Sequence, residues 1–275
     1  AHLRDVQPLS KRSYYRTDMK KIFTVVIIVF CVLLSSCAVI KNDFQEPTTE
    51  KPSTDTEATF EKRVIKTSEL SAFKFWLYTP ENAKSGLPLI VYLHGGSGKG
   101  DDLEQITAVD GFPKYLKDGN FSELNAYVVI PQLSADKHGW SDIKSSIKEL
   151  ILYMQQKYGT DVSETSLTGH SMGGTGTWDI ALAFPTLFSR IAPMSGSIKL
   201  TDTNIKKLAN IQIRAFVGSA DTIVSPSSSV DFIAALSKIN KAAQITVFDG
   251  AGHFDIPSLA YLGTDIVSWL AEKSN

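Results

Sequence analysis

Gly169-His170-Ser171-Met172-Gly173 carries the strongest fold signal in this sequence, because a strand pattern leads into it and a helix pattern follows it. Residues 165–168 fit a short strand, and the residues after Gly173 are apolar at helical spacing. A serine between two glycines at such a junction predicts a sharp, strained turn. The turn lifts the serine hydroxyl clear of the sheet, beside the first free N–H groups of the helix. The pattern therefore predicts a nucleophilic Ser171 next to amides that can stabilise an oxyanion.

A nucleophilic serine needs a general base, and in this arrangement the chain order is serine, acid, histidine. His253 is the only histidine after Ser171. It stands in a glycine-rich loop after residues 244–248, whose alternating apolar pattern fits a late strand. We therefore predict that His253 is the base.

The acid that orients the base should follow the preceding strand. Residues 211–217 fit that strand, and the loop after it contains Asp221, which we predict to be the acid. Asp249 and Asp255 flank the histidine and are the alternatives. Either can be a solvated turn residue, which is common for aspartate in loops.

A second oxyanion donor is expected at the end of an earlier strand. The continuous apolar run 89–93 fits a strand buried on both faces, and it ends in His94-Gly95-Gly96. We predict that the backbone N–H groups of Gly96 and Met172 form the oxyanion hole, and that His94 braces the loop. A phosphate-binding glycine loop is the competing interpretation, but the required G-x-x-x-x-G-K-[ST] pattern is missing.

Together, residues 94–96, residues 169–178, Asp221 and His253 resemble the α/β-hydrolase superfamily. Within it, the chain is most similar to lidless serine esterases of the phospholipase/carboxylesterase and feruloyl-esterase type, which also resemble polyhydroxybutyrate depolymerases. The resemblance covers about residue 60 to the C-terminus. It implies an α/β fold, with a mostly parallel sheet and helices on both faces, and a serine esterase acting through an acyl-enzyme.

Further strand and helix patterns alternate along the rest of this region, as expected for a parallel sheet with helical crossovers. An antiparallel edge is expected before the parallel strands. Only residues 196–210 separate two of the expected strands, which leaves no room for a large lid. The expected strands span 61–67, 73–78, 89–93, 126–130, 165–168, 188–194, 211–217 and 245–248, and the expected helices include 112–116, 143–158, 228–239 and 258–270.

The start of the chain favours export. Residues 1–18 precede a better start at Met19 and are set aside as an upstream segment. Residues 19–36 combine a basic beginning with an apolar run too short for a comfortable membrane span, as in a signal peptide. They lead into Cys37 through Leu-Ser-Ser, which resembles a bacterial lipobox, so we predict that Cys37 carries a lipid. An uncleaved signal anchor is the alternative, because residues 38–40 extend the apolar run.

Residues 41–59 are polar and charged with few apolar side chains, so we predict that residues 37–59 form a lipidated flexible tether. Residues 60–275 then form the catalytic domain. Both cysteines precede that domain, so no disulfide is expected in it. The protein is therefore expected at the bacterial surface or membrane, attached through the lipid anchor alone.

The composition of the chain argues against several classes of binding partner. The chain has a formal net charge of −1 and no basic stripe with interleaved aromatic residues, so no nucleic acid partner is expected. It also has no Cys/His cluster at metal-ligand spacing, and neither a metal nor another cofactor is expected.

The expected substrates are extracellular short-chain or aryl esters, including feruloyl esters, either as small molecules or linked to polysaccharide. Trp140 follows a strand at the active-site end and is predicted to form an aromatic substrate wall, with packing at the rim as the alternative. A serine peptidase or amidase of the same fold and a catalytically silent surface-binding domain remain alternative functions. Acyl and alcohol specificity depend on loops that the sequence pattern does not place.

Overall fold

The computed structural model describes residues 58–273. The chain divides into two units, Ala1–Thr49 and Glu50–Asn275, and the described residues all belong to the second. The predicted signal peptide, Cys37 and most of the predicted tether lie outside the described residues. The first strand begins at Thr59, one residue before the predicted start of the catalytic domain.

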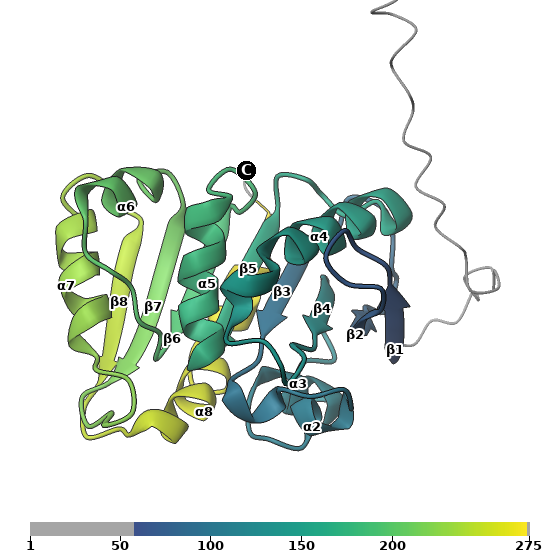
Figure 1. Ribbon diagram of the computed structural model, residues 1–275, viewed down its shortest axis with the longest axis horizontal. Helices are drawn as coiled ribbons and strands as arrows, with labels where there is room; N and C mark the ends of the chain where they lie inside the picture. The colour runs from purple at the N-terminus through teal and green to yellow at the C-terminus, as the bar shows by residue number, and fades with distance from the viewer. Residues whose placement is uncertain (1–57, 274–275) are drawn as a thin grey trace, which may run out of the picture. The chain divides into compact units, whose positions relative to one another are not determined.

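An eight-stranded sheet forms the centre of this unit, in the order β1-β2-β4-β3-β5-β6-β7-β8 (Figure 1). The pairs β1–β2 and β2–β4 are antiparallel, and all the other pairs are parallel, which confirms the expected antiparallel edge. The strands are β1 (Thr59–Ile65), β2 (Phe73–Thr79), β3 (Leu89–Leu93), β4 (Tyr127–Pro131), β5 (Thr165–His170), β6 (Arg190–Met194), β7 (Gln212–Gly218) and β8 (Ala243–Phe248).

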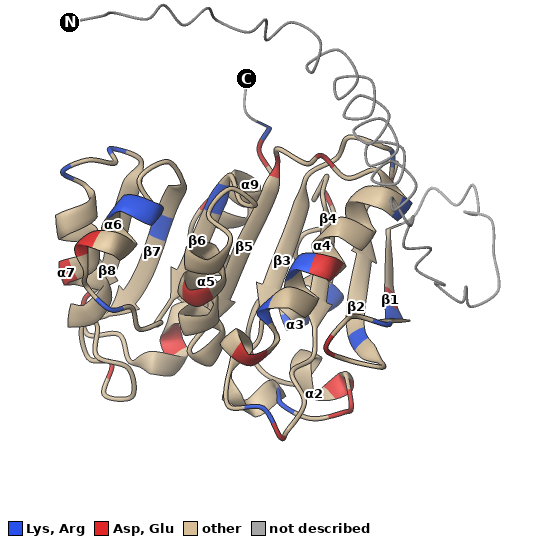
Figure 2. Cartoon of the chain, turned by 45° about the horizontal axis from the view of Figure 1, so that its top comes forward, with Lys and Arg blue, Asp and Glu red and all other residues tan. Residues whose placement is uncertain are grey.

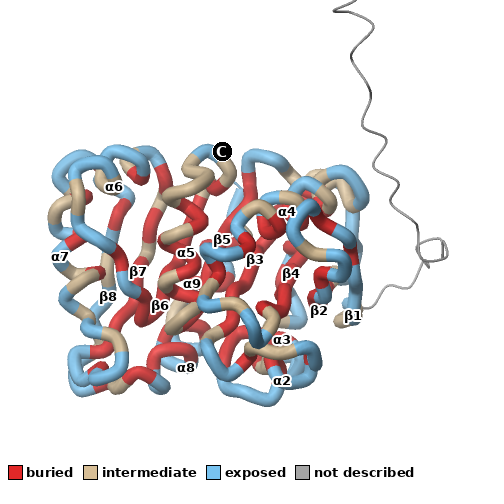
Figure 3. Tube along the Cα trace, viewed as in Figure 1, coloured by how far each residue is buried: buried red, intermediate tan, exposed pale blue. Residues whose placement is uncertain are grey.

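Helices cover both faces of the sheet, as predicted. Alternate residues of β3 divide between two apolar clusters: Val91 packs with residues of α4, α5 and α7, and Ile90 packs with residues of α3, α8 and α9. This is the pattern of a strand buried on both sides, and Figure 3 shows the buried chain running through the sheet. The helices are α2 (Glu104–Thr107), α3 (Phe112–Lys117), α4 (Lys144–Tyr158), α5 (Met172–Ala183), α6 (Asp202–Lys207), α7 (Ser227–Leu236), α8 (Ile256–Tyr261) and α9 (Ile266–Leu270), with 3₁₀ turns at Gly96–Gly98, Trp140–Ile143 and His253–Asp255.

The helix predicted over residues 258–270 is wrong as a single element. It is divided into α8 and α9 around Gly263 and Thr264. The Thr264 hydroxyl donates to the Ala260 carbonyl at 2.7 Å and accepts the Ile266 N–H at 3.2 Å. A side chain that bonds the backbone in this way competes with the helical ladder, and the adjacent glycine weakens it further.

The connection from β6 to β7 contains only the short helix α6, so no large lid lies there. No helix within residues 58–273 is long and apolar enough to cross a membrane. In Figure 2, basic and acidic residues are interspersed over the helices and loops of this unit.

Candidate active site

Ser171 occupies the turn between β5 and α5 in a strained conformation, with φ 60° and ψ −119°. A non-glycine residue seldom adopts a positive φ, and such strain is held only where the surroundings enforce it. The surroundings impose this conformation through a close contact between α5 and β3. At Gly173, a Cβ would overlap the carbonyl oxygen of Leu93 in β3. The close approach of helix and strand that the glycines permit therefore fixes the serine at the carboxyl end of the sheet.

The structure brings Ser171, His253 and Asp221 together, although they follow three different strands. His253 Nε2 lies 2.8 Å from Ser171 Oγ, and His253 Nδ1 lies 2.7 Å from Asp221 Oδ2. The histidine and the aspartate are both buried. One continuous chain of hydrogen bonds thus runs from a buried carboxylate through an imidazole to a hydroxyl.

Asp221 is held as a carboxylate by its own loop. Its Oδ1 accepts the backbone N–H groups of Ile223 and Val224, each at 2.9 Å. Burial raises the pKa of Asp221, but the hydrogen bonds from the Val224 amide, from His253 and from the Ile223 amide outweigh burial and hold the pKa below its usual value. An ionised Asp221 accepts from Nδ1–H and so keeps the Nε2 lone pair of His253 directed at the serine.

The two alternative aspartates have other partners. Asp249 Oδ1 accepts the Ser219 hydroxyl at 3.1 Å, and Asp255 Oδ2 accepts the Gly252 N–H at 2.7 Å. Both residues therefore stabilise the loops around the site, and Asp221 alone among the three bonds the histidine ring.

The Gly95–Gly96 peptide passes beside the serine. A Cβ on Gly95 would lie 3.6 Å from the Ser171 Cβ, whereas one on Gly96 would meet no atom within 4 Å. Met172 is the first residue of α5, where a backbone N–H has no acceptor within the helix. These positions are compatible with oxyanion donation by Gly96 and Met172, which stays a prediction.

His94 braces this loop, as expected from the sequence. Its Nε2 accepts the Leu133 N–H at 3.0 Å, which leaves Nδ1 as the donor to the Gly95 carbonyl at 2.7 Å. Burial lowers the pKa of His94 to about 4, so the ring is neutral at pH 7 and can fill both roles.

Gln132, the residue directly after β4, is a second brace that the sequence pattern did not single out. Its Nε2 donates to the carbonyls of Gly98 and Asp102, at 3.0 and 2.8 Å. The segment from the glycine loop to α2 is thereby attached to the neighbouring strand.

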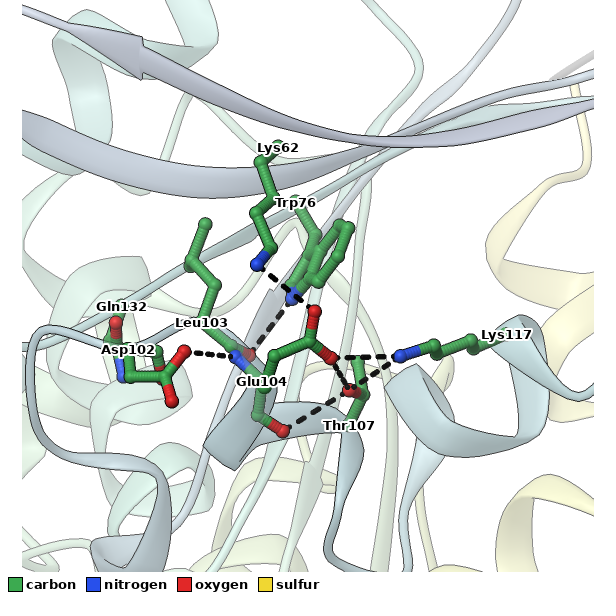
Figure 4. Close-up of polar contacts among 8 residues, drawn as sticks. All are labelled: Lys62, Trp76, Asp102, Leu103, Glu104, Thr107, Lys117 and Gln132. Carbon is green, nitrogen blue, oxygen red and sulfur yellow. Dashed lines mark hydrogen bonds and ion pairs between the residues drawn. The ribbon is translucent and has the colours of Figure 1, made fainter.

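A surface network attaches α2 to the antiparallel edge (Figure 4). The Glu104 carboxylate lies 2.9 Å from Lys117 and 3.0 Å from Lys62, and the Trp76 indole donates to the Leu103 carbonyl at 2.9 Å. The hydrogen bonds from Lys117 and then Lys62 lower the pKa of Glu104 to about 2. The two ion pairs are half-exposed, so they orient α2 more than they stabilise the domain.

The predicted substrate wall at Trp140 is wrong. Trp140 is 1% exposed, and its ring belongs to the core on the α4 and α5 side of the sheet. A Cβ on Gly176 would lie 2.7 Å from the indole, so this glycine makes room for it. The indole N–H donates to the His94 carbonyl at 3.0 Å. Trp140 therefore supports the glycine loop from behind and presents no face to a substrate.

Replacing Trp140 by phenylalanine should lower the free energy of unfolding by about 1–3 kcal/mol, because the buried His94 carbonyl loses its donor. Urea denaturation measures this change. Trp178→Phe is the matched control, since the Trp178 indole N–H is buried without a hydrogen-bond partner among the described residues and its loss should cost less. Unchanged stability of Trp140→Phe with a raised KM for aryl esters alone would restore the substrate-wall interpretation.

His170 is a residue of the site that the sequence pattern did not single out. Its Nε2 lies 2.9 Å from the carbonyl oxygen of His253, and the two imidazole rings are 4.6 Å apart. Its position before the serine in the glycine motif carries no chemical requirement, so the contact becomes visible only in the structure.

The arrangement can perform nucleophilic substitution at a carbonyl. The hydroxyl has a base within proton-transfer distance, and the base has an ionised partner. The first amides of α5 begin directly beside the serine, where oxyanion donors are expected. Within residues 58–273, no group of three or more His, Cys, Asp or Glu side chains could hold a metal ion.

Solved structures share this fold. A thermostable esterase superposes with a TM-score of 0.66 at 22% identity, over 78% of this chain and 63% of that protein, so the chain spans less than two thirds of its length. The feruloyl esterase module from Clostridium thermocellum, in complex with sinapinate, gives a TM-score of 0.57 at 15% identity, over 77% of this chain and 90% of the module. The fluorophosphonate-binding serine hydrolase F of Staphylococcus aureus gives 0.59 at 17% identity, over 79% and 100%.

A search of curated protein sequences gives no match. The model of the Esterase family, however, matches residues 71–255, a range that includes Ser171, Asp221 and His253. Since this match covers more than half of the chain, the chain belongs to the Esterase family, and its sheet has the α/β-hydrolase fold of the solved esterases and serine hydrolases.

Proposed function

We propose that this esterase hydrolyses carboxylic esters through an acyl-enzyme on Ser171. The observation that carries the proposal is the unbroken Asp221–His253–Ser171 chain, with hydrogen-bond distances of 2.7 and 2.8 Å. Asp221 and His253 are buried, which keeps bulk water from competing for the bonds.

In the first half-reaction, Ser171 Oγ attacks the ester carbonyl carbon while His253 Nε2 accepts the hydroxyl proton. The negative charge on the carbonyl oxygen is received by the amides of Gly96 and Met172. His253 returns the proton to the departing alcohol, and an ester between Ser171 and the acyl group remains. Water, deprotonated by His253, then attacks that ester and releases the acid and the free serine.

The substrate class we propose is short-chain or aryl esters, including feruloyl groups linked to polysaccharide. Two exposed apolar side chains support it: Phe254, 75% exposed, packs edge-on against the His253 ring, and Ile223, 58% exposed, follows Asp221. Exposed apolar side chains near the histidine and the aspartate fit the acyl or aryl part of an ester. The feruloyl esterase module with the same fold, bound to sinapinate, supports the aryl option.

A substrate panel tests this proposal. We expect kcat/KM to be highest for p-nitrophenyl acetate or butyrate or for methyl ferulate, and to fall along the series to octanoate. An aminoacyl p-nitroanilide should be cleaved far more slowly. Preference for the anilide would show a peptidase or amidase, and no turnover of any compound by a folded protein would favour the silent surface-binding domain.

We further propose that the protein is exported and attached to a bacterial membrane through a lipid on Cys37. The support is the sequence of residues 19–37, with its basic start, short apolar run and lipobox-like end. Stable attachment needs more than one acyl chain, which a multiply acylated cysteine provides.

Replacing Cys37 by alanine should move the protein from the membrane to the soluble fraction, because the lipid has no attachment point. The chain is expressed from Met19 in a bacterium, and the fractions are compared by immunoblot and esterase activity. Growth with a radioactive fatty acid serves as the control, and label is expected only on the protein that retains Cys37. Equal membrane retention of both forms would support the uncleaved signal anchor instead.

A further inference from the structure

His170 lies in the strand that ends directly before Ser171, and it contacts the proposed base, His253. It is the last residue of β5, 8% exposed, and its Nε2 lies 2.9 Å from the carbonyl oxygen of His253. The two imidazole rings are 4.6 Å apart and inclined by 44°. One side chain thus contacts both the backbone and the ring of the residue that must face Ser171.

The contact requires a hydrogen on Nε2 of His170. A carbonyl oxygen only accepts, so Nε2 of His170 carries the hydrogen. Burial, followed by repulsion from the charge of His253, lowers the pKa of His170 to about 4, while the bond to the His253 carbonyl and the charge of Asp221 act in the opposite direction. His170 is therefore a neutral donor at pH 7.

The loop that carries His253 needs such a constraint. Gly250 and Gly252 precede the histidine, and Gly250 has a φ of 69°, in a region open mainly to glycine. A glycine-rich loop can change its conformation at little cost in free energy. Catalysis, however, is sensitive to the position of the base. The neutral state also matters, because a charged ring 4.6 Å from His253 would oppose the imidazolium that forms during acylation.

We propose that His170 is a positioning residue that holds the His253 ring where it can hydrogen-bond to both Ser171 and Asp221. The inference rests on the proposed function, because it presumes that His253 is the base. His170 contacts no reacting atom, so it acts through His253 alone. Its loss should lower kcat and leave KM nearly unchanged.

Three substitutions distinguish the contribution of the His170 hydrogen bond from the contribution of its ring. His170→Gln keeps a donor at about the reach of Nε2, His170→Asn has a donor too short to reach, and His170→Phe keeps a ring without a donor. We expect kcat to fall by about 10–10²-fold in the Asn and Phe variants, with KM within about twofold of the unmodified enzyme. The Gln variant should recover most of the activity. If the Phe variant does not fold, the Gln and Asn pair decides.

A spectroscopic measurement supplies a readout that packing alone would not change. The strongly downfield proton resonance expected for His253 Nδ1–H, bonded to Asp221, should persist in the Gln variant and broaden or vanish in the Asn variant. Thermal unfolding midpoints are recorded for all variants, to show that the folded state is compared in each case.

Wild-type kcat in the Asn and Phe variants would overturn the inference, and so would an equal loss in all three variants. The two proposals fail separately. If Ser171→Ala is inactive while the His170 variants are fully active, only the positioning role is wrong. If Ser171→Ala remains active, the proposed function itself is wrong.

Discussion

Replacing Ser171 by alanine is expected to lower kcat by about 10⁵–10⁶-fold, the loss seen when the serine of a triad that works as a unit is removed. The physical reason is that His253, 2.8 Å from the missing hydroxyl, then has no nucleophile to deprotonate. Residual hydrolysis would come from binding and the oxyanion amides alone. Steady-state kinetics on p-nitrophenyl butyrate measures the loss.

The Ser171→Ala protein should remain folded, because alanine keeps the Cβ and the turn is held by backbone contacts. The Ser171 N–H donates to the Met194 carbonyl, and the Thr175 N–H donates to the Ser171 carbonyl, each at 2.9 Å. Circular dichroism and the thermal midpoint verify this. A folded variant that keeps a tenth of the activity would exclude Ser171 as the nucleophile.

Replacing Asp221 by asparagine should lower kcat by about 10⁴-fold. An amide placed where Asp221 Oδ2 lies can donate to the ring, which favours the imidazole tautomer with its hydrogen on Nε2. That tautomer has no lone pair for the serine proton. The loss should be smaller than for Ser171→Ala, since a nucleophile and a base both remain.

The chain offers two matched controls for this variant. Asp249→Asn and Asp255→Asn change the same chemical group in the neighbouring loops, where the carboxylates bond Ser219 and Gly252. Both should retain activity within about tenfold, because neither carboxylate bonds the His253 ring. An inactive Asp249→Asn or Asp255→Asn, beside an active Asp221→Asn, would show that the acid has been assigned to the wrong strand end.

Chain order explains why the triad residues could be predicted to meet. In a parallel sheet, the carboxyl ends of all strands lie at one edge, so the first loop after each strand faces the same crevice. Ser171 follows β5, Asp221 follows β7 and His253 follows β8. The strand patterns therefore placed these residues together without any knowledge of their contacts.

The direction of the Trp140 side chain could not be predicted in the same way. Its loop does leave a strand at the active-site edge, but the direction of a loop side chain depends on tertiary space. Here that space is opened by Gly176 on another element, and the indole turns into the core. His170 is the converse case, since a buried polar side chain in a strand has no periodic signature, and its partner lies on a distant loop. Phe254 and Ile223, the exposed side chains proposed to contact the substrate, also lie in connections between strands and helices, so the sequence pattern does not place them.

If ester hydrolysis proceeds through a covalent bond to Ser171, a reagent that traps this serine should leave an adduct that mass spectrometry detects. The enzyme is treated with a fluorophosphonate, which phosphonylates an activated serine by displacing fluoride, and is then analysed by intact and peptide mass spectrometry. We expect one adduct per chain, located on Ser171, with activity lost in proportion and no adduct on Ser171→Ala. An adduct on another residue that accompanies the loss of activity, or full activity with Ser171 quantitatively modified, would contradict it.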